Sequence, residues 1–212
     1  MPTVEAWSLW LHIAAGTVAV LAGVGALVTE KGGRRHRAAG KLFLAAMAVT
    51  VATVFVLLAA AVTTFRIVLT LVAIFSGYLA FSGYRALSRK RPDDSPQAVD
   101  WLAAAAVVLA CLALGGWGVA WFLGGSSFGL VMAVFGAIGV AFGGQDLWSF
   151  RRGGNGAWIV SHLQRMVAAF IATVSAVSAV NLGPTLGVVA WLWPTIVGTP
   201  LIAYWSNEYE PD

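Results

Sequence analysis

Two ionisable side chains of this sequence lie inside an apolar run, where ionisable groups are rare. His162 and Arg165 are spaced i, i+3 within the run from Trp158 to Asn181, so they share one face of a helix. The run is long enough to cross a bilayer, and an ionisable group at membrane depth costs at least about 2.5 kcal/mol. We therefore expect both side chains to have partners or a function.

Their expected partners lie near the ends of neighbouring apolar runs. Asp146 ends the preceding run, and His36 and Arg37 stand in a basic loop before the second run. With a helical rise of about 1.5 Å per residue, a helix centred near residue 169 places His162 and Arg165 on the same side of the bilayer midplane as these groups. The sequence thus predicts a ligand-binding polar site formed by His36, Arg37, Asp146, His162 and Arg165.

Three roles for this site stay open at the level of sequence. In the first, Arg165 pairs with Asp146, His162 bonds a backbone carbonyl, and the cluster locks helices together. In the second, His36, His162 and Asp146 hold a divalent metal ion, since imidazole and carboxylate are suitable ligands. In the third, Arg37 and Arg165 bind an anionic headgroup, a carboxylate or a quinone oxygen. The sequence names no cofactor.

The sequence gives less support to haem binding and to nucleophilic catalysis. His12 lies in the opposite half of the bilayer from His162, so the two do not form an obvious pair of haem ligands. We expect His12 and Asn181 to be structural polar residues, with His12 bonded to a neighbouring helix. Cys111 is the only cysteine, and no Ser–His–Asp or Cys–His set is placed for nucleophilic work. The sequence therefore favours a protein that is not an enzyme.

The composition predicts the fold that must position these residues. The chain is 59% hydrophobic and only 10% charged, whereas soluble domains are nearer a quarter charged, so we expect the solvent to be lipid. A span needs about 20 apolar residues. Seven runs meet this need and predict an all-α integral membrane bundle forming a single domain over residues 1–212. They cover 7–29, 41–63, 66–87, 101–123, 127–148, 158–181 and 186–205.

Two local features refine this prediction. We expect the sixth and seventh runs to meet at Leu182–Gly183–Pro184. Gly139 and Gly143 have the spacing at which membrane helices approach closely. They are therefore candidates for a helix contact.

The loop charges predict the orientation. Eleven of the 13 basic residues fall in loops on one side: Lys31, Arg34, Arg35, Arg37, Lys41, Arg85, Arg89, Lys90, Arg91, Arg151 and Arg152. Since basic loops stay in the cytoplasm, the N-terminus is expected outside and the C-terminus inside. The polar site then lies in the cytoplasmic half. The placement of most basic residues in loops between apolar runs also argues against nucleic acid as a partner, so none is expected.

The tryptophans agree with this orientation. Indole rings prefer the two membrane–water interfaces. The sequence places Trp7, Trp10, Trp117, Trp121, Trp191 and Trp193 toward the outer interface, and Trp101, Trp148, Trp158 and Trp205 toward the inner one.

A short internal repeat suggests a duplicated helix pair. The segment 80–85, AFSGYR, ends the third run, and the segment 141–146, AFGGQD, ends the fifth. Each is followed by a basic loop and a further run.

Several motifs resemble one known family. They are His12-x3-Gly16, Lys31-Gly-x3-His36-Arg37-x2-Gly40-Lys41, His162-x2-Arg165-Met166, Asn181 and Trp193-Pro-Thr-x2-Gly198-Thr-Pro200. Together they resemble a family of multi-pass bacterial membrane proteins known as a domain of unknown function. The resemblance covers most of the chain except roughly 88–130. It implies a helical bundle in the bacterial cytoplasmic (inner) membrane, and it implies no activity.

Three functions follow as expectations. The first is a membrane protein whose polar site binds a metal, a quinone or a small anion. The alternative is a structural or accessory subunit of a larger respiratory, photosynthetic or other membrane assembly, with other membrane proteins as partners beside the lipid bilayer. The third is a small-solute or proton-coupled transporter with His162 and Asp146 as relay groups.

Overall fold

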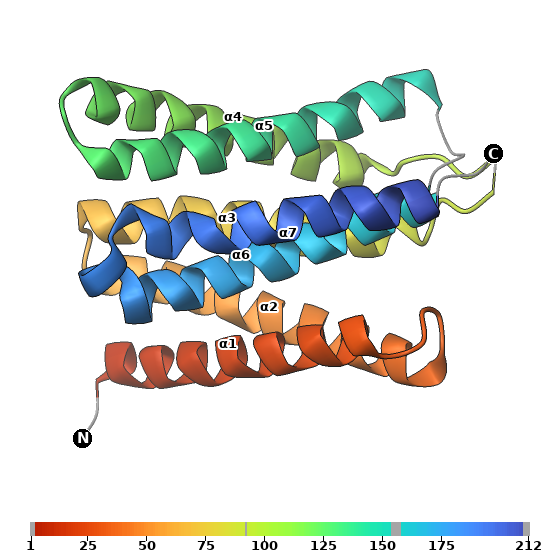
Figure 1. Ribbon diagram of the computed structural model, residues 1–212, viewed down its shortest axis with the longest axis horizontal. Coiled ribbons are helices and arrows are strands. Elements are labelled where there is room, and N and C mark those ends of the chain that lie inside the picture. The colour runs from red at the N-terminus through yellow and green to blue at the C-terminus, as the bar shows by residue number, and fades with distance from the viewer. Residues whose placement is uncertain (1–2, 92, 154–157, 210–212) are drawn as a thin grey trace. The chain divides into compact units, whose positions relative to one another are not determined.

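The helices of this protein were located in a computed structural model that describes residues 3–91, 93–153 and 158–209. Within these residues the fold is all-helical, with no strand (Figure 1). The helices are α1 (Val4–Val28), α2 (Arg34–Ala60), α3 (Thr64–Ala86), α4 (Ala98–Leu123), α5 (Ser127–Arg152), α6 (Trp158–Leu186) and α7 (Val188–Glu208). All seven are long and apolar enough to cross a membrane. The predicted number and type of elements are confirmed.

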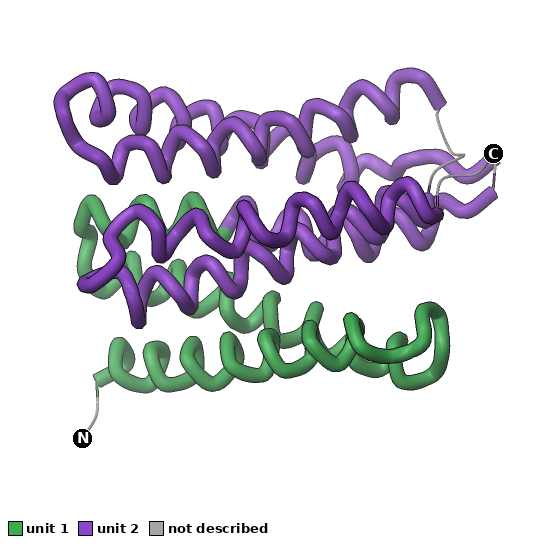
Figure 2. The backbone as a smooth tube through the Cα atoms, in the orientation of Figure 1, with its two compact units in different colours: residues 1–73 green, residues 74–212 purple. Residues whose placement is uncertain are grey.

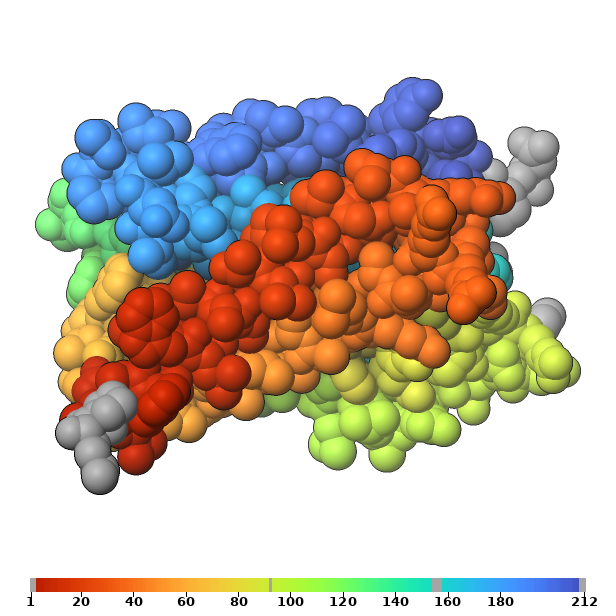
Figure 3. All heavy atoms as spheres, turned by 90° about the horizontal axis from the view of Figure 1, so that it is seen from below, coloured from red at the N-terminus to blue at the C-terminus, as the bar shows by residue number. Residues whose placement is uncertain are grey.

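The chain divides into two compact units, residues 1–73 and residues 74–212 (Figure 2). The boundary lies inside α3, so a continuous helix joins the units. The prediction of a single domain over residues 1–212 stays a prediction. In the first unit α1 packs against α2, and in the second α4 packs against α5 and α7 packs against α5 and α6. Figure 3 shows the red and orange side chains of α1 and α2 lying next to each other.

A polar contact joins three helix ends of the first unit. Arg66, in the first turn of α3, donates to Glu5 Oε1 and to the Leu57 carbonyl oxygen, each at 2.5 Å. Glu5 lies in the first turn of α1 and Leu57 in the last turn of α2. Arg66 is the one basic residue that the loop charges leave on the outer side. Its ion pair with Glu5 explains how a cation is accommodated there.

Glycines allow α4 and α5 to approach closely. A Cβ atom added at Gly136 would lie 2.5 Å from Gly115 Cα, and one at Gly143 would lie 2.8 Å from Val107 Cγ1. A Cβ at Gly139 would clash with the Cys111 sulfur. Gly139 and Gly143 therefore belong to a helix contact, as their spacing predicts.

Two predicted boundaries are wrong. The helix α2 begins at Arg34, so His36 and Arg37 lie in its first turn and not in the loop before it. The helix α6 continues through Pro184 to Leu186, and the turn comes at Gly187, whose φ is 53° and ψ −129°. Only glycine reaches such a conformation without strain. The chain therefore reverses at this glycine instead of at the proline.

Candidate functional site

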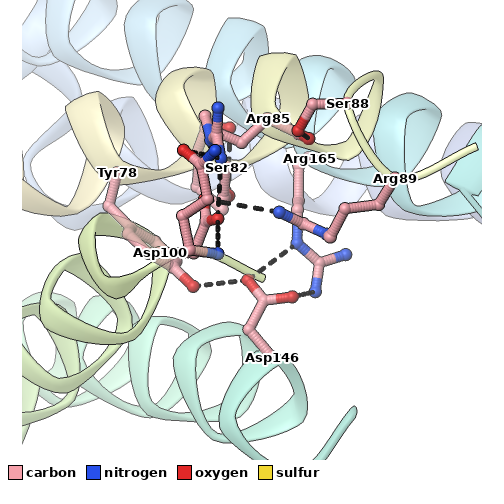
Figure 4. Close-up of polar contacts among 10 residues, drawn as sticks. Tyr78, Ser82, Arg85, Ser88, Arg89, Asp100, Asp146 and Arg165 are labelled. Carbon is pink, nitrogen blue, oxygen red and sulfur yellow. Dashed lines mark hydrogen bonds and ion pairs between the residues drawn. The ribbon is translucent and has the colours of Figure 1, made fainter. Parts of the chain in front are cut away.

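A buried ion pair lies at the centre of the candidate site. Arg165 Nε donates to Asp146 Oδ2 at 3.1 Å, and Nη2 donates to Oδ1 at 2.5 Å. The Tyr78 hydroxyl also donates to Oδ2. Asp146 is 5% exposed and Arg165 is 2% exposed. Figure 4 shows the Asp146 carboxylate between the tyrosine and the guanidinium group. The three side chains link α3, α5 and α6.

One face of α5 positions this pair. Phe142, Asp146 and Phe150 follow each other at i, i+4 and i+8, so they form one stripe along the helix. The guanidinium carbon of Arg165 lies 5.5 Å from the centre of the Phe142 ring, within reach of a cation–π contact. The carboxylate thus receives its partners in an apolar setting, where each charge needs the other.

His162 is held one turn before Arg165 on α6. Its Nδ1 atom lies 2.8 Å from the Gly83 carbonyl oxygen, so Nδ1 carries the hydrogen in this contact. A Cβ atom at Gly83 would lie 3.0 Å from the Met166 side chain and 3.2 Å from Arg165 Cβ. The absence of a side chain at residue 83 therefore lets α3 reach α6. This bond and the Asp146–Arg165 pair are the contacts that the ion-pair interpretation predicts.

The structure gives the metal hypothesis no geometric support. Among the described residues, no group of three or more His, Cys, Asp or Glu side chains is arranged to hold a metal ion. Asp146 accepts hydrogen bonds from Arg165 and Tyr78. Both of its oxygens are thereby engaged, which favours an internal ion pair over a metal ligand.

A second acidic residue, which the sequence interpretation missed, lies at the start of α4. Asp100 is 3% exposed and forms a two-fold contact with Arg85, Nε to Oδ1 at 2.8 Å and Nη2 to Oδ2 at 2.9 Å. Arg89 Nη1 lies 3.3 Å from Asp100 Oδ1. Asp100 Oδ2 also accepts from the Gln97 backbone nitrogen at 2.8 Å, which caps the helix.

The two ion pairs, Arg85–Asp100 and Arg165–Asp146, have the same arrangement of contacts with the acidic and basic residues exchanged between helices. Arg85, near the end of α3, holds Asp100 in the first turn of α4, whereas Asp146, near the end of α5, is held by Arg165 of α6. In both pairs Nε and Nη2 of the arginine contact the two carboxylate oxygens. The AFSGYR and AFGGQD repeat aligns Arg85 with Asp146, and this alignment was the signal that could have revealed Asp100.

Cations near the same helix ends lie on aromatic rings. Lys90 Nζ is 4.6 Å from the centre of the Trp158 ring, and the guanidinium carbon of Arg152 is 4.2 Å from that of Trp148. The guanidinium carbon of Arg89 lies 5.1 Å from the Phe150 ring. These contacts gather at the ends that the loop charges assign to the cytoplasmic side.

Two guanidinium nitrogens of the second unit are buried without a hydrogen-bond partner in the described part of the chain. They are Nη1 of Arg89 and Nη1 of Arg165. Buried polar atoms are nearly always hydrogen-bonded. Within the described residues each of these nitrogens is a donor without a hydrogen-bond acceptor, although Arg89 Nη1 lies 3.3 Å from Asp100 Oδ1 in an ion pair.

The remaining predicted residues lie elsewhere. His36 and Arg37 belong to the first unit, where His36 Nδ1 lies 3.0 Å from the Ala26 carbonyl oxygen of α1 and Arg37 is exposed. His12 Nδ1 lies 2.9 Å from Thr53 Oγ1 of α2, so its expected bond to a neighbouring helix is present. Asn181 is exposed and donates to the Val177 carbonyl oxygen at 2.7 Å.

Of the five residues of the predicted ligand site, three belong to the second unit: Asp146, His162 and Arg165. The structure joins Asp146 to Arg165 directly and places His162 on the same helix as Arg165. Whether His36 and Arg37 take part in the site stays a prediction.

Comparison with models of known protein families, with curated proteins and with solved structures finds no match. The resemblance of the motifs around His36 and His162 to a bacterial membrane family therefore stays a prediction.

Proposed function

We propose that this chain is a multi-pass protein of a bacterial cytoplasmic membrane, with its N-terminus outside and its C-terminus in the cytoplasm. We further propose that it binds a lipid-soluble ligand with a carbonyl oxygen, of the quinone class, beside Arg165. Seven apolar helices and basic loops on one side support the membrane location. A membrane location makes an apolar ligand accessible to the site.

One observation carries the ligand proposal. Arg165 is 2% exposed, two of its nitrogens hold Asp146, and Nη1 has no partner among the described residues. A buried donor without an acceptor costs about 1–3 kcal/mol. A ligand oxygen that accepts this hydrogen would remove the cost. Arg165 is therefore the residue that we assign to binding.

The charge of the site selects a neutral ligand. Arg165 and Asp146 neutralise each other, and Tyr78 adds only a hydroxyl donor to the same carboxylate. An anion placed here would face Asp146 without a surplus positive charge. A carbonyl oxygen accepts a hydrogen bond and brings no charge. The Phe142 ring beside the guanidinium offers an apolar surface to the rest of such a ligand.

The test uses the full-length protein in mild detergent and a short-chain benzoquinone as probe. We expect the quinone to raise the thermal unfolding temperature of the wild type, because it binds only the folded state. Arg165→Lys keeps the charge opposite Asp146 but removes the planar group that carries Nη1, and it should lose the quinone effect. Arg91→Lys, a change at an exposed arginine, is the matched control and should keep it.

The alternatives give different results. No stabilisation of the wild type at saturating quinone, or an equal effect in Arg165→Lys, would reject the ligand proposal. A stable complex with other membrane proteins would then support the accessory-subunit hypothesis. Elemental analysis of the same preparations tests the metal hypothesis, since a stoichiometric metal that His162→Ala removes would establish it.

A further inference from the structure

The cluster around Asp100 carries a surplus positive charge. Its single carboxylate is matched by two arginines, Arg85 and Arg89. Both oxygens of Asp100 are already occupied, because Arg85 contacts each of them and the Gln97 backbone nitrogen shares Oδ2. Asp100 therefore sets one negative charge against two positive charges, and the cluster keeps a net positive charge. In this respect the cluster differs from the neutral pair at Asp146.

Arg89 is the arginine that lacks a full partner. Its side chain is 11% exposed, and Nη1 lies 3.3 Å from Asp100 Oδ1 without forming a hydrogen bond there. The ring of Phe150 covers one face of its guanidinium group at 5.1 Å. The group is thus fixed in place, and its Nη1 atom donates no hydrogen bond to the described part of the chain. A fixed guanidinium with a free donor suits a phosphate or carboxylate oxygen.

The neighbouring residues indicate where the anion comes from. Lys90 follows Arg89 and lies over Trp158, and Arg152 lies over Trp148, which is itself 57% exposed. Exposed tryptophans near the ends of membrane helices sit at the level of the lipid headgroups. Cations held on these rings therefore lie at the depth of the headgroup phosphates. Binding of a phosphate dissolved in the cytoplasm would not require tryptophan side chains at headgroup depth beside the cations.

We propose that Arg89, assisted by Lys90 and Arg152, binds the phosphate group of an anionic phospholipid. A phosphodiester carries one negative charge, which matches the surplus charge of the Asp100 cluster, and its oxygens accept from the exposed part of the Arg89 guanidinium group. The inference rests on the proposed membrane insertion. It concerns a different set of side chains from the Arg165 site, although both sets lie in the second unit. Figure 4 shows Arg89 beside Asp100 and Arg165 beside Asp146.

The experiment titrates the delipidated full-length protein in detergent with phosphatidylglycerol and with phosphatidylcholine and counts bound lipids by native mass spectrometry. The wild type should prefer phosphatidylglycerol. Arg89→Gln should weaken phosphatidylglycerol binding by about fivefold, the effect of one cation near an anionic lipid, and leave phosphatidylcholine binding unchanged. Arg89→Lys, which keeps the charge but not the fork, should fall between Arg89→Gln and the wild type.

A matched control separates a defined site from general attraction. Arg91→Gln removes the same charge from the same loop, at an exposed residue, and should keep the wild-type preference. An equal loss in Arg91→Gln and Arg89→Gln would overturn the proposal. Arg89→Lys also guards against a folding defect, because it preserves the ion pair with Asp100.

Two further measurements identify the source of the phosphate and the origin of any failure. Inorganic phosphate at millimolar concentration should not displace phosphatidylglycerol, and complete displacement would assign the site to a free anion instead. Extraction of cell membranes with alkaline carbonate tests insertion separately. A protein that stays in the membrane but shows no lipid preference would reject the lipid site alone, whereas an extracted protein would reject the proposed membrane location.

Discussion

At the scale of single residues, the second unit depends on Asp146. Its carboxylate accepts from Arg165 and from Tyr78, and all three side chains are buried. Taking such a pair out of water is costly, and removing one partner leaves the other charge uncompensated. The contribution of Asp146 should therefore be visible as a large loss on substitution, even if an apolar replacement of the whole cluster cost little.

Replacement of Asp146 by asparagine is the first prediction. Arg165 would keep its charge in a buried setting without a counter-ion, so Asp146→Asn should lower the free energy of unfolding by about 3–5 kcal/mol. Unfolding in mixed detergent micelles, followed by circular dichroism, measures this value. Asp93→Asn is the control, because Asp93 is exposed, and it should change stability by less than about 0.5 kcal/mol. Similar values for the two variants would contradict the buried ion pair.

Removal of the Tyr78 hydroxyl is the second prediction. Tyr78→Phe deletes one donor to Asp146 but leaves the pair with Arg165 intact, so it should cost about 1–3 kcal/mol. Tyr84→Phe serves as the control, since Tyr84 is 47% exposed. The cost of Tyr78→Phe should shrink in the Asp146→Asn background, because the charged acceptor is then gone. An unchanged cost in that background would mean that the hydroxyl acts elsewhere.

At the scale of elements, α4 and α5 are held by close backbone approach. Gly136 meets Gly115 of α4, and membrane helices associate through such contacts because lipid supplies no hydrophobic drive between them. A methyl group in this contact would force the two helices apart. Glycines of α4 that face away from the contact should tolerate a side chain.

Alanine at these two kinds of glycine is the third prediction. Gly136→Ala places a Cβ atom 2.5 Å from Gly115 Cα and should destabilise the protein by about 1–3 kcal/mol, the usual cost of overpacking. A Cβ at Gly116 has no atom within 4 Å. Gly116→Ala should therefore be neutral or stabilise α4 by up to about 1 kcal/mol. Thermal unfolding of both variants measures the two effects, and equal changes in unfolding temperature would argue against the helix contact.

The turn between α6 and α7 gives the fourth prediction. Gly187 has a φ of 53° with ψ of −129°, which an alanine adopts only with strain of about 1–3 kcal/mol. Gly183 lies within α6, and a Cβ there has no atom within 4 Å. Gly187→Ala should lower the unfolding temperature, whereas Gly183→Ala should preserve or raise it. The reverse order would move the chain reversal to Pro184, where the sequence had predicted it.

At the scale of the whole molecule, the basic loops predict which helix ends face the cytoplasm. The exception, Arg66, is a single basic residue against eleven on the other side, and it is paired with Glu5. The ion pairs Arg85–Asp100 and Asp146–Arg165 lie toward the helix ends that are next to the basic loops. In the proposed orientation these ends are cytoplasmic.

Labelling of single cysteines tests this orientation and is the fifth prediction. With Cys111→Ala as background, Ser88→Cys should react with a membrane-impermeant maleimide only in inverted vesicles, because the loop after α3 is expected inside. Thr63→Cys, in the turn between α2 and α3, should react in intact cells. Both residues are exposed, so a failure to react reports sidedness instead of burial. The opposite pattern would invert the proposed topology.

The sequence by itself determined the helices of this protein. Each apolar run is long enough to span lipid, and the backbone hydrogen bonds of a helix close within the run, so the type and number of elements need no tertiary information. The predicted helix boundaries were wrong at Gly187 and at the first turn of α2, where the local backbone conformation determines the boundary. A positive φ and a helix start outside the apolar run leave little trace in hydropathy.

The tertiary structure alone decided which polar groups meet. The sequence predicted that Asp146 and Arg165 lie on one side of the membrane, but only the tertiary structure, which brings the two side chains together, shows that they pair. The sequence could not show that Tyr78 and Asp100 belong to these polar clusters. A tyrosine in an apolar run and an acidic residue at a helix start both have ordinary local explanations. Helix rotation selects the partners of such side chains, and that rotation depends on contacts between residues far apart in the chain.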